Sequence, residues 1–370
     1  MPWPRRHTNY APRVVALMAT AGIGETLPPI AQDRTVRPRP FVARHGRVLF
    51  AWALLIAIIA AYVVVVPQFR PREQRTLINS GLTLATASLG QTLVVLTGGI
   101  DLSIGPMVSL TNSIASATTE KESPNSSMVK AAAAALGAGA LGGLINGVLV
   151  AYGRLQPIIV TLATGSIWTG IALYIRPSPG GFIPLDFSNL LSGTAFNDPV
   201  PLPLGVTWSY PLPKAAFVVA GLVIFWVLFR RSRLATRIYA VGSSEGAAYL
   251  SGVHVQRAKL AAYTLAGLAA GCAGLVNSSQ TATGNALSGT VFTLNSIAAV
   301  VLGGAALAGG AGSYLGTLAG AYVIAIIPSV LQFYGVSSFY KDLVQGSILL
   351  FAVALGAFGL LRVRNRMDRL

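Results

Sequence analysis

The chain has 370 residues, of which 53% are hydrophobic and only 10% are charged. Soluble domains carry roughly 25% charged residues, so this composition argues against a water-soluble globular protein. The formal net charge of +16 comes from 27 Lys and Arg against 11 Asp and Glu. These basic residues lie between apolar runs and form no stripe interleaved with aromatic side chains, so nucleic acid is not an expected partner.

Residues 1–46 are rich in Pro and Arg and contain no apolar run long enough to cross a bilayer. We predict that this segment is a disordered, basic tail in the cytoplasm. A cleavable signal peptide does not fit, because the short apolar run 14–21 is followed by a polar, Pro-rich stretch.

About ten apolar segments follow, each close to the roughly 20 residues that a helix needs to cross the hydrocarbon core. They cover residues 48–66, 77–98, 103–117, 129–152, 157–175, 215–229, 259–279, 292–308, 314–332 and 343–361. The predicted fold class is an all-α membrane protein with broken helices, in which a transmembrane domain spans residues 47–362 and a cytoplasmic tail spans 363–370.

The positions of Lys and Arg predict the topology, because loops on the cytoplasmic side carry an excess of them. Both termini are expected inside the cell. This arrangement places the following arginines on the cytoplasmic side: Arg154, Arg230, Arg231, Arg233, Arg237, Arg257, Arg362, Arg364, Arg366 and Arg369. The loop with Arg70, Arg72 and Arg75 disagrees, since it would face outward.

The same topology places a long Pro-rich loop, residues 176–214, outside the cell and a second loop, residues 231–258, in the cytoplasm. The eight prolines of the outer loop predict irregular and fairly rigid structure. This loop is either a docking surface or a connector without a partner.

The second and third spans are separated by a break, residues 96–106, that contains three Gly and one Pro. Irregular backbone at membrane depth is tolerated only where protein or water satisfies it, so the break should face a cavity or the helix bundle. Asp101 lies within it. In one interpretation Asp101 or Ser103 caps the next helix, and in the other Asp101 lines a substrate path; the two are compatible.

A Gly-Gly-x-x-Leu-x-x-Gly pattern occurs at residues 98–105 and again at 303–310, and Val-Val-Leu precedes both copies. An even number of crossings separates them, so the two copies would share one orientation, which predicts an internal parallel repeat. Chance similarity in a chain with 40 glycines is the alternative.

Catalytic and metal-binding patterns are weak. Residues 242–246 match the Gly-x-Ser-x-Gly pattern of hydrolases, but they follow no strand and have no partner among His7, His45 and His254. No Lys stands in a phosphate-binding loop, so an ATPase site is not expected on this chain. Cys272 is the only cysteine, and no His, Cys or carboxylate cluster predicts a metal site.

The cytoplasmic loop 231–258 contains one short helix signal. Ser243 or Ser244 can cap it, Glu245 falls in its first turn, and Gly252 can end it. Such a helix is too short to cross the bilayer and is expected to lie along the membrane surface.

This loop and several other segments resemble the membrane subunits of ribose, xylose, arabinose and galactose ABC importers. The matching segments are Thr-Gly-Gly-Ile-Asp-Leu-Ser at 97–103, Asn-Gly at 146–147, Gly-Arg-Leu at 153–155, residues 157–163 and 297–304, Ala-Gly-Gly at 308–310 and Gly-Val-Ser-Ser at 335–338. The resemblance covers roughly residues 79–355, and the blocks occur in the family's order.

The resemblance implies a permease subunit that translocates a monosaccharide through the bacterial cytoplasmic (inner) membrane. Its expected partners are membrane lipid, a second permease copy in a homodimer or heterodimer, a periplasmic or lipid-anchored binding protein, and a cytoplasmic ATPase that holds ATP and Mg. No cofactor is expected on this chain. The residues expected to contact the ATPase are Ser244, Glu245, Ala247, Ala248, Leu250, Ser251 and Gly252. Those expected along the substrate path are Gly98, Gly99, Asp101, Ser103, Gly303 and Gly304.

Two alternatives remain open at this level. Many relatives carry Glu where this chain has Thr293, which leaves the solute open, and a nucleoside or a furanose signal molecule is the first alternative. The second is an ion-coupled secondary transporter, which would need an intramembrane charge network. Only Asp101 and the pair Lys341 and Asp342 offer one.

Overall fold

The computed structural model describes residues 41–66, 70–195, 200–201, 207–208 and 211–333, together with single residues between 335 and 350. Its contacts divide the chain into two units, Met1–Arg44 and His45–Leu370, and the packing described below lies within the second unit. Two predicted features fall outside the described residues. They are the two tails, apart from residues 41–46, and most of the predicted tenth span, 343–361.

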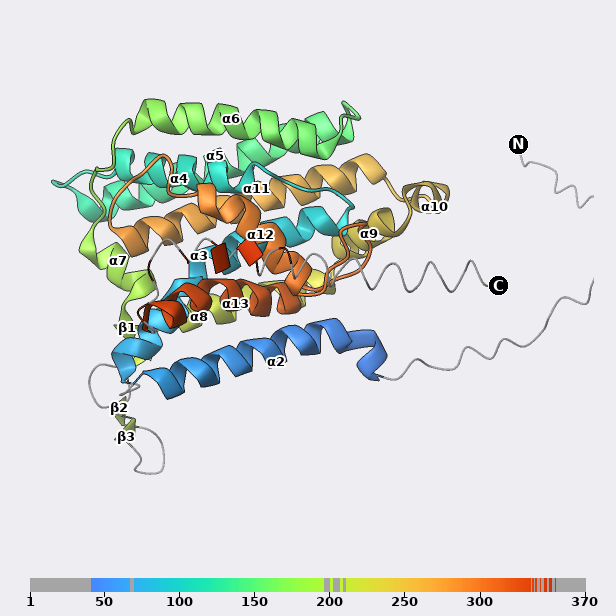
Figure 1. Ribbon diagram of the computed structural model, residues 1–370. Coiled ribbons are helices and arrows are strands. Elements are labelled where there is room, and N and C mark those ends of the chain that lie inside the picture. The colour runs from blue at the N-terminus through green and yellow to red at the C-terminus, as the bar shows by residue number, and fades with distance from the viewer. Residues whose placement is uncertain are drawn as a thin grey trace, which may run out of the picture. The chain divides into compact units, whose positions relative to one another are not determined.

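Nine of the predicted spans coincide with helices (Figure 1). These helices are α2 (Phe41–Val65), α3 (Pro71–Leu96), α4 (Ile104–Thr118), α5 (Pro124–Ala151), α6 (Pro157–Ile175), α8 (Lys214–Arg230), α11 (Val255–Thr281), α12 (Thr290–Leu302) and α13 (Tyr314–Phe333). Two predicted boundaries are wrong. The first helix begins at Phe41, inside the predicted tail, and α12 ends at Leu302, because residues 303–313 form a glycine-rich loop.

Within the described residues, five helices are long and apolar enough to cross a membrane: α2, α5, α6, α11 and α13. A sixth crossing is possible if α8 and the following α9 (Arg233–Ser243), which bend by 76° at their junction, form one span. The predicted all-α membrane fold is confirmed. The predicted count of ten crossings is not confirmed, since α4 and α12 are short.

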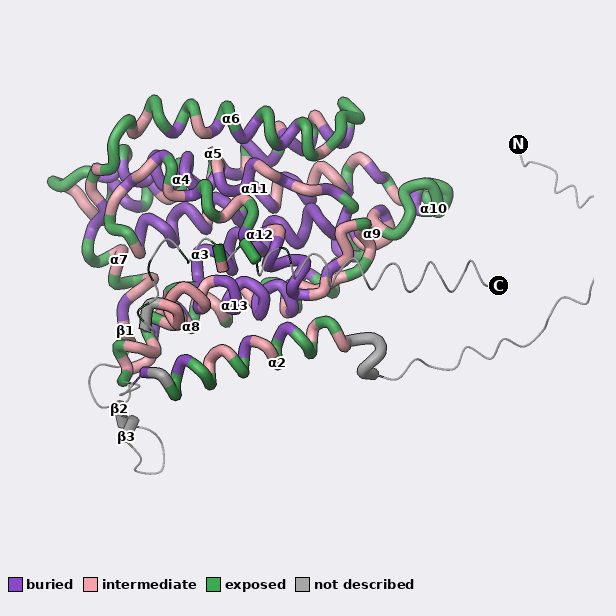
Figure 2. Tube along the Cα trace, viewed as in Figure 1, coloured by how far each residue is buried: buried purple, intermediate pink, exposed green. Residues whose placement is uncertain are grey.

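Helix α3 lies at the centre of the helix bundle, between α11 on one side and α12 and α13 on the other (Figure 1). All residues from Gly81 to Leu96 are buried, as the purple tube of α3 shows in Figure 2. Its polar side chains bind neighbouring helices: Thr83 donates to Gln280 at 2.8 Å, and Thr92 donates to Thr317 at 3.0 Å. Each buried hydroxyl thereby gains a partner that the bilayer cannot supply.

Helices α2 and α6 lie at the periphery, with long exposed stretches (Figure 2). Only 17% of the apolar window of α2 and 33% of that of α6 are buried, against 67% for α11. Their exposed residues are large and apolar, for example Ile56, Val64 and Ile159. A helix that exposes such side chains in a membrane protein faces lipid or another subunit.

Helices α5 and α11 cross at glycines. A methyl group on Gly267 would overlap the Gly139 carbonyl oxygen and lie 2.7 Å from the Gly143 Cα atom, so backbone meets backbone at this crossing. Small residues four apart allow this close approach, and the buried dispersion contacts stabilise helix pairs in a bilayer, where the hydrophobic effect is weak. These glycines therefore serve the packing of α5 against α11.

The outer loop 176–214 is more regular than its prolines predict. It contains α7 (Leu185–Ser192) and two small antiparallel sheets, in which β1 (Thr194–Ala195) pairs with β4 (Leu212–Pro213) and β2 (Val200–Pro201) pairs with β3 (Thr207–Trp208). The hydroxyl of Ser188 donates to the Ser279 carbonyl and fixes α7 to the C-terminal end of α11. Prolines at strand ends are compatible with this, because each paired segment is only two residues long.

Substitution Gly267→Ala tests the glycine crossing. Its methyl group meets only backbone atoms, so we expect destabilisation of about 1–3 kcal/mol, typical of overpacking, and a lower unfolding temperature in detergent. Gly137→Ala on α5 is the matched control, because nothing lies within 4 Å of its Cβ position. The control should be neutral or slightly stabilising, since Ala has the higher helix propensity. Equal melting of both variants would contradict the assigned packing.

Candidate functional site

The break after α3 begins with a helix end whose backbone is satisfied internally. The amide of Gly98 donates to the Val95 carbonyl at 2.9 Å, and that of Gly99 donates to the Val94 carbonyl at 3.2 Å. Gly98 has φ +82°, a left-handed conformation that side chains disfavour. These two bonds form the Schellman motif, which uses carbonyls that a helix end otherwise leaves free.

Helix α12 ends in the same way, but not at the glycine that the sequence repeat pairs with Gly98. Gly304 has φ +85°, and its amide donates to the Val301 carbonyl at 2.9 Å. Gly98 is therefore equivalent to Gly304, and the match of Gly98 with Gly303 is wrong by one residue. The corrected register aligns the two Val-Val-Leu runs, and Val95 and Val300 share one buried cluster, so the two helix ends lie together.

Asp101 is buried and serves as an acceptor within the break. Its Oδ1 atom accepts hydrogen bonds from the amide of Ser103 at 2.8 Å and from the Ser103 hydroxyl at 2.6 Å. Asn146 on α5 donates to the same hydroxyl at 2.8 Å, and Thr164 on α6 donates to the Asn146 carbonyl oxygen at 2.7 Å. This polar chain connects the start of α4, where Ser103 is the N-cap residue, to α5 and α6.

The backbone on both sides of Asp101 is also bound. With its amide in the orientation that satisfies both partners, the Gln91 side chain donates to the Asp101 carbonyl and accepts from the Asp101 amide. The Leu102 amide donates to the Thr161 hydroxyl at 3.0 Å. Among the described residues, no Lys or Arg forms an ion pair with Asp101. Asp101 thus closes a turn with Ser103 just before α4, but neither Asp101 nor Ser103 makes a side-chain capping bond to the first turn of the helix. A contact of Asp101 with substrate stays a prediction.

The residues predicted for the substrate path separate in the structure into two groups and Gly99, which lies apart from both against Tyr263 on α11. Asp101 and Ser103 face α5 and α6, as described above. Gly303 packs against Gly316 on α13, and Gly304 packs against Arg47 on α2. Gly98 lies against the loop that follows α12, so only this residue is shared by both neighbourhoods.

Sequence reasoning missed a groove of about 570 Å³ between α4, α6 and the start of α12. Pro106, Ser166, Thr169 and Thr293 contribute to its lining, together with Leu102 of the break and leucines of α6 and α12. Hydroxyls beside exposed leucines give a surface that is neither a plain lipid face nor a packed core. No local signal predicts it, because α6 and α12 are far apart in the sequence.

The short helix in the cytoplasmic loop is present as predicted. Helix α10 (Glu245–Leu250) begins after Ser244, whose hydroxyl accepts from the Ala247 amide at 3.3 Å, and Gly252 follows it with φ +78°. The apolar residues of α10 differ in exposure: Ala248 is buried within this chain, while Leu250 is 87% exposed. Of the apolar residues of α10, Leu250 is thus free to meet a partner and Ala248 is not.

Helix α9 was not predicted. Ser232 caps it by accepting from the Ala235 amide at 3.1 Å, and the buried residues Ala235, Ile238 and Val241 recur every third position. A serine followed by that spacing is the signal that could have revealed an amphipathic helix. The Tyr239 hydroxyl donates a hydrogen bond to the Gly312 carbonyl at 2.7 Å. Burial raises the pKa of this phenol, an effect that Arg230 partly offsets.

The end of α9 packs directly on the break. A methyl group on Gly242 would overlap the Leu96 carbonyl oxygen, which accepts from the Gly310 amide at 3.1 Å. A methyl group on Gly309 would lie 2.7 Å from the Gly98 nitrogen. We call this meeting of Leu96, Gly98, Gly242, Gly309 and Gly310 the glycine junction. It joins the cytoplasmic loop to both helix ends without intervening side chains.

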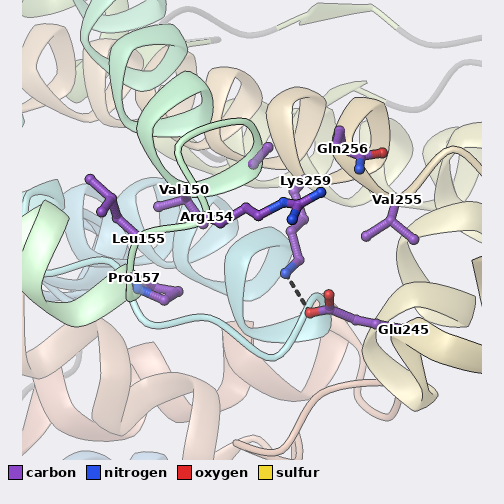
Figure 3. A pocket seen from close by; sticks show the side chains of 9 residues that line it. Val150, Arg154, Leu155, Pro157, Glu245, Val255, Gln256 and Lys259 are labelled. Atoms are coloured by element: carbon purple, nitrogen blue, oxygen red, sulfur yellow. Dashed lines mark ion pairs between the residues drawn. The ribbon is translucent and has the colours of Figure 1, made fainter.

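A pocket of about 290 Å³ lies beside α10, between the turn that joins α5 to α6 and the start of α11 (Figure 3). Glu245 and Lys259 form an ion pair at its edge, and Arg154 extends into it from the turn. Arg154 has φ +55°, an uncommon conformation for a residue with a side chain. The pocket thus carries two cations and one anion.

Substitutions at Asp101 test its role as the acceptor for the Ser103 amide and hydroxyl. Asp101→Ala leaves the Ser103 amide and hydroxyl without their acceptor in a buried place, which should cost about 1–3 kcal/mol of stability. Asp101→Asn retains an acceptor oxygen and should recover most of that loss. Thermal unfolding in detergent measures both variants. If Asp101→Asn destabilises the protein as much as Asp101→Ala, the negative charge, and not the acceptor, is what the break requires.

Substitution Gly242→Ala tests the glycine junction. The added methyl group must displace the Leu96 carbonyl, so we expect α9 to separate from the break and proteolysis of the loop 231–258 to accelerate several-fold. The matched control is Gly246→Ala in the same loop, where the Cβ position is open. Unchanged cleavage rates for Gly242→Ala would show that α9 does not depend on this contact.

Comparison with known proteins agrees with the resemblance. Residues 74–353 match the family described as branched-chain amino acid transport system / permease component. The chain is 36% identical to a ribose import permease of Escherichia coli over 283 residues, covering 76% of this chain and 82% of the relative. It is 34% identical over 270 residues to the ribose import permease of Bacillus subtilis, which covers 72% of this chain and 79% of the relative. It is 31% identical over 301 residues to an L-arabinose ABC transporter permease of Azospirillum brasilense, which covers 81% of this chain and 84% of the relative. No solved structure matches. With these matches over most of its length and an all-α membrane fold, the chain is a multi-pass membrane protein that belongs to this family of transport-system permease components.

Proposed function

We propose that this chain is the membrane-spanning permease subunit of an ATP-driven importer of a monosaccharide. The observation that carries the proposal is the 36% identity with a ribose import permease over 76% of the chain. An arabinose transporter permease is also related, which favours a pentose or similar sugar as the solute. The nucleoside or furanose alternative differs only in solute, whereas the identified family argues against an ion-coupled secondary transporter.

Energy is supplied by a separate ATPase that holds ATP and Mg, and its contact is α10 with the exposed Tyr249 and Leu250. Ser244, Glu245, Ala247, Ser251 and Gly252 surround this contact. Support comes from the position of α10 in the chain, between the end of α9 and the start of α11. The end of α9 meets the glycine junction, and Lys259 in the first turns of α11 pairs with Glu245 of α10. A displacement of α10 would therefore reach the backbone at Leu96 and Gly98 through a short path of rigid elements.

A second permease copy completes the pore, and the groove beside Thr293 and Ser166 is the surface proposed to face it. Hydroxyls in that groove could bind the hydroxyl groups of a sugar as it passes. Both termini lie in the cytoplasm, so the outer loop with α7 faces the periplasm, where a substrate-binding protein docks. Ser188 on α7 and Ser279 on α11 each donate a hydrogen bond to the other's carbonyl oxygen, and a helix fixed in this way suits a docking surface.

Reconstitution tests the proposal directly. The chain, its ATPase and its binding protein in liposomes should take up radiolabelled ribose or another pentose only when ATP is present. Leu250→Arg should reduce ATP-dependent uptake at least tenfold while the protein stays inserted and folded, because the exposed side chain lies on the proposed contact. Substitution of Ala248 is a poor test, since this residue is buried within the chain. Uptake of a nucleoside and of no sugar would overturn the solute assignment, and normal uptake by Leu250→Arg would overturn the contact.

A further inference from the structure

The pocket beside α10 has the properties of an anion site (Figure 3). Lys259 is neutralised by Glu245, whereas the guanidinium of Arg154 has no hydrogen-bond or ion-pair partner among the described residues. The pocket edge therefore retains one uncompensated positive charge. A planar guanidinium with free donors binds a carboxylate through two parallel hydrogen bonds.

The surrounding backbone adds to this preference. Helix α6 begins at Pro157 and α11 begins at Val255, both of which line the pocket. Neither helix has a side-chain cap, because Gln156 and His254 make no capping hydrogen bond. Two helix N-termini thus direct the positive ends of their dipoles toward the cavity that holds Arg154 and Lys259.

The position of the pocket identifies the kind of partner. Glu245, the first residue of α10, forms one wall, and the exposed side chains of Tyr249 and Leu250 follow on the next turn. A protein that docks on α10 would cover the mouth of the pocket as well. We propose that an acidic side chain of the ATPase subunit inserts into this pocket and pairs with Arg154, which gives the ATPase a second anchor beside α10. This inference rests on the proposed function, since it needs the ATPase as the partner.

The anchor has a structural consequence. Arg154 belongs to the turn between α5 and α6, whereas α10 follows α9, so the ATPase would hold two separate parts of the permease. Val150, at the base of the pocket, shares a buried cluster with Val94 at the end of α3. Force applied through Arg154 would therefore act on the break from the side opposite to the glycine junction.

Arg154→Gln is the test variant and Arg237→Gln is its matched control. Both arginines are exposed and in the same cytoplasmic part of the chain, but Arg237 lies on α9 and does not line the pocket. The purified permease in nanodiscs is titrated with its ATPase at low and high salt. We expect Arg154→Gln to weaken the affinity for the ATPase about tenfold or more and to reduce the salt dependence of that affinity. Arg154→Lys should retain most of the affinity, and Arg237→Gln should change the affinity less than twofold.

Several outcomes would overturn the inference. Equal losses for Arg154→Gln and Arg237→Gln would reduce the effect to general electrostatic attraction. A different result would assign the pocket to a lipid phosphate. In that case Arg154→Gln would bind the ATPase with unchanged affinity, and native mass spectrometry would detect bound phosphatidylglycerol on the wild type but not on the variant. An unchanged unfolding temperature is expected for Arg154→Gln, since the guanidinium makes no contact that supports the fold. Wild-type permease that fails to bind the ATPase at all would overturn the proposed function itself, which distinguishes the two failures.

Discussion

The hydrocarbon core of a bilayer offers no hydrogen-bond partners, and the architecture around α3 follows from that constraint. Helix α3 carries buried hydroxyls and an amide, and it ends inside the helix bundle at Leu96, two residues before Gly98. The last carbonyl groups of the helix accept hydrogen bonds in a Schellman motif. The backbone of the following residues binds the side chains of Gln91 and Thr161, and the Asp101 carboxylate accepts from Ser103. Neighbouring helices are placed where they can provide these partners. The break is thus a packed and bonded element, and its polar groups specify which helices must surround it.

Glycine makes the second contribution, because it lets backbones touch. At the crossing of α5 and α11 this produces a rigid helix pair. At the glycine junction it brings α9, from the loop 231–258, against the Leu96 carbonyl and the loop after α12. Interactions between backbones leave little room for side chains to absorb a displacement. A movement imposed on α10 and α9 by a partner would therefore be transmitted to the two helix ends that meet there.

On the predicted cytoplasmic side, the backbone contacts of the glycine junction lie near a group of charged side chains. Most loop arginines lie on the predicted cytoplasmic side, which first determines orientation in the membrane. The same residues can then serve recognition, as we propose for Arg154 in the pocket beside Glu245 and Lys259. Exposed ion pairs of this kind contribute little to stability, so their value lies in specificity and in the rate of docking. Orientation and partner binding are consequently encoded by one set of basic side chains.

Local sequence signals were sufficient for much of the fold. Apolar runs of about 20 residues predicted nine helices that the structure contains, and Ser244 with Gly252 predicted the bounds of α10, because a cap and a helix stop act on adjacent residues. The existence of two related helix ends was also visible. Their register was not, because a Gly-Gly pattern can be aligned at either glycine and only the left-handed residue, Gly98 or Gly304, shows which one ends the helix.

Only the tertiary structure decided the contacts between distant parts of the chain. Thr92 and Thr317 are 225 residues apart, Leu96 meets Gly242 and Gly310, and the groove and the pocket are each lined by three or more elements. Such contacts depend on which helix faces pack together, and a nearly uniform apolar surface does not determine this locally. The sequence by itself thus determined a polytopic membrane protein of importer type with a short-helix signal in the loop 231–258. The structure decided that this loop rests on the break, because glycines in three separate segments allow their backbones to meet.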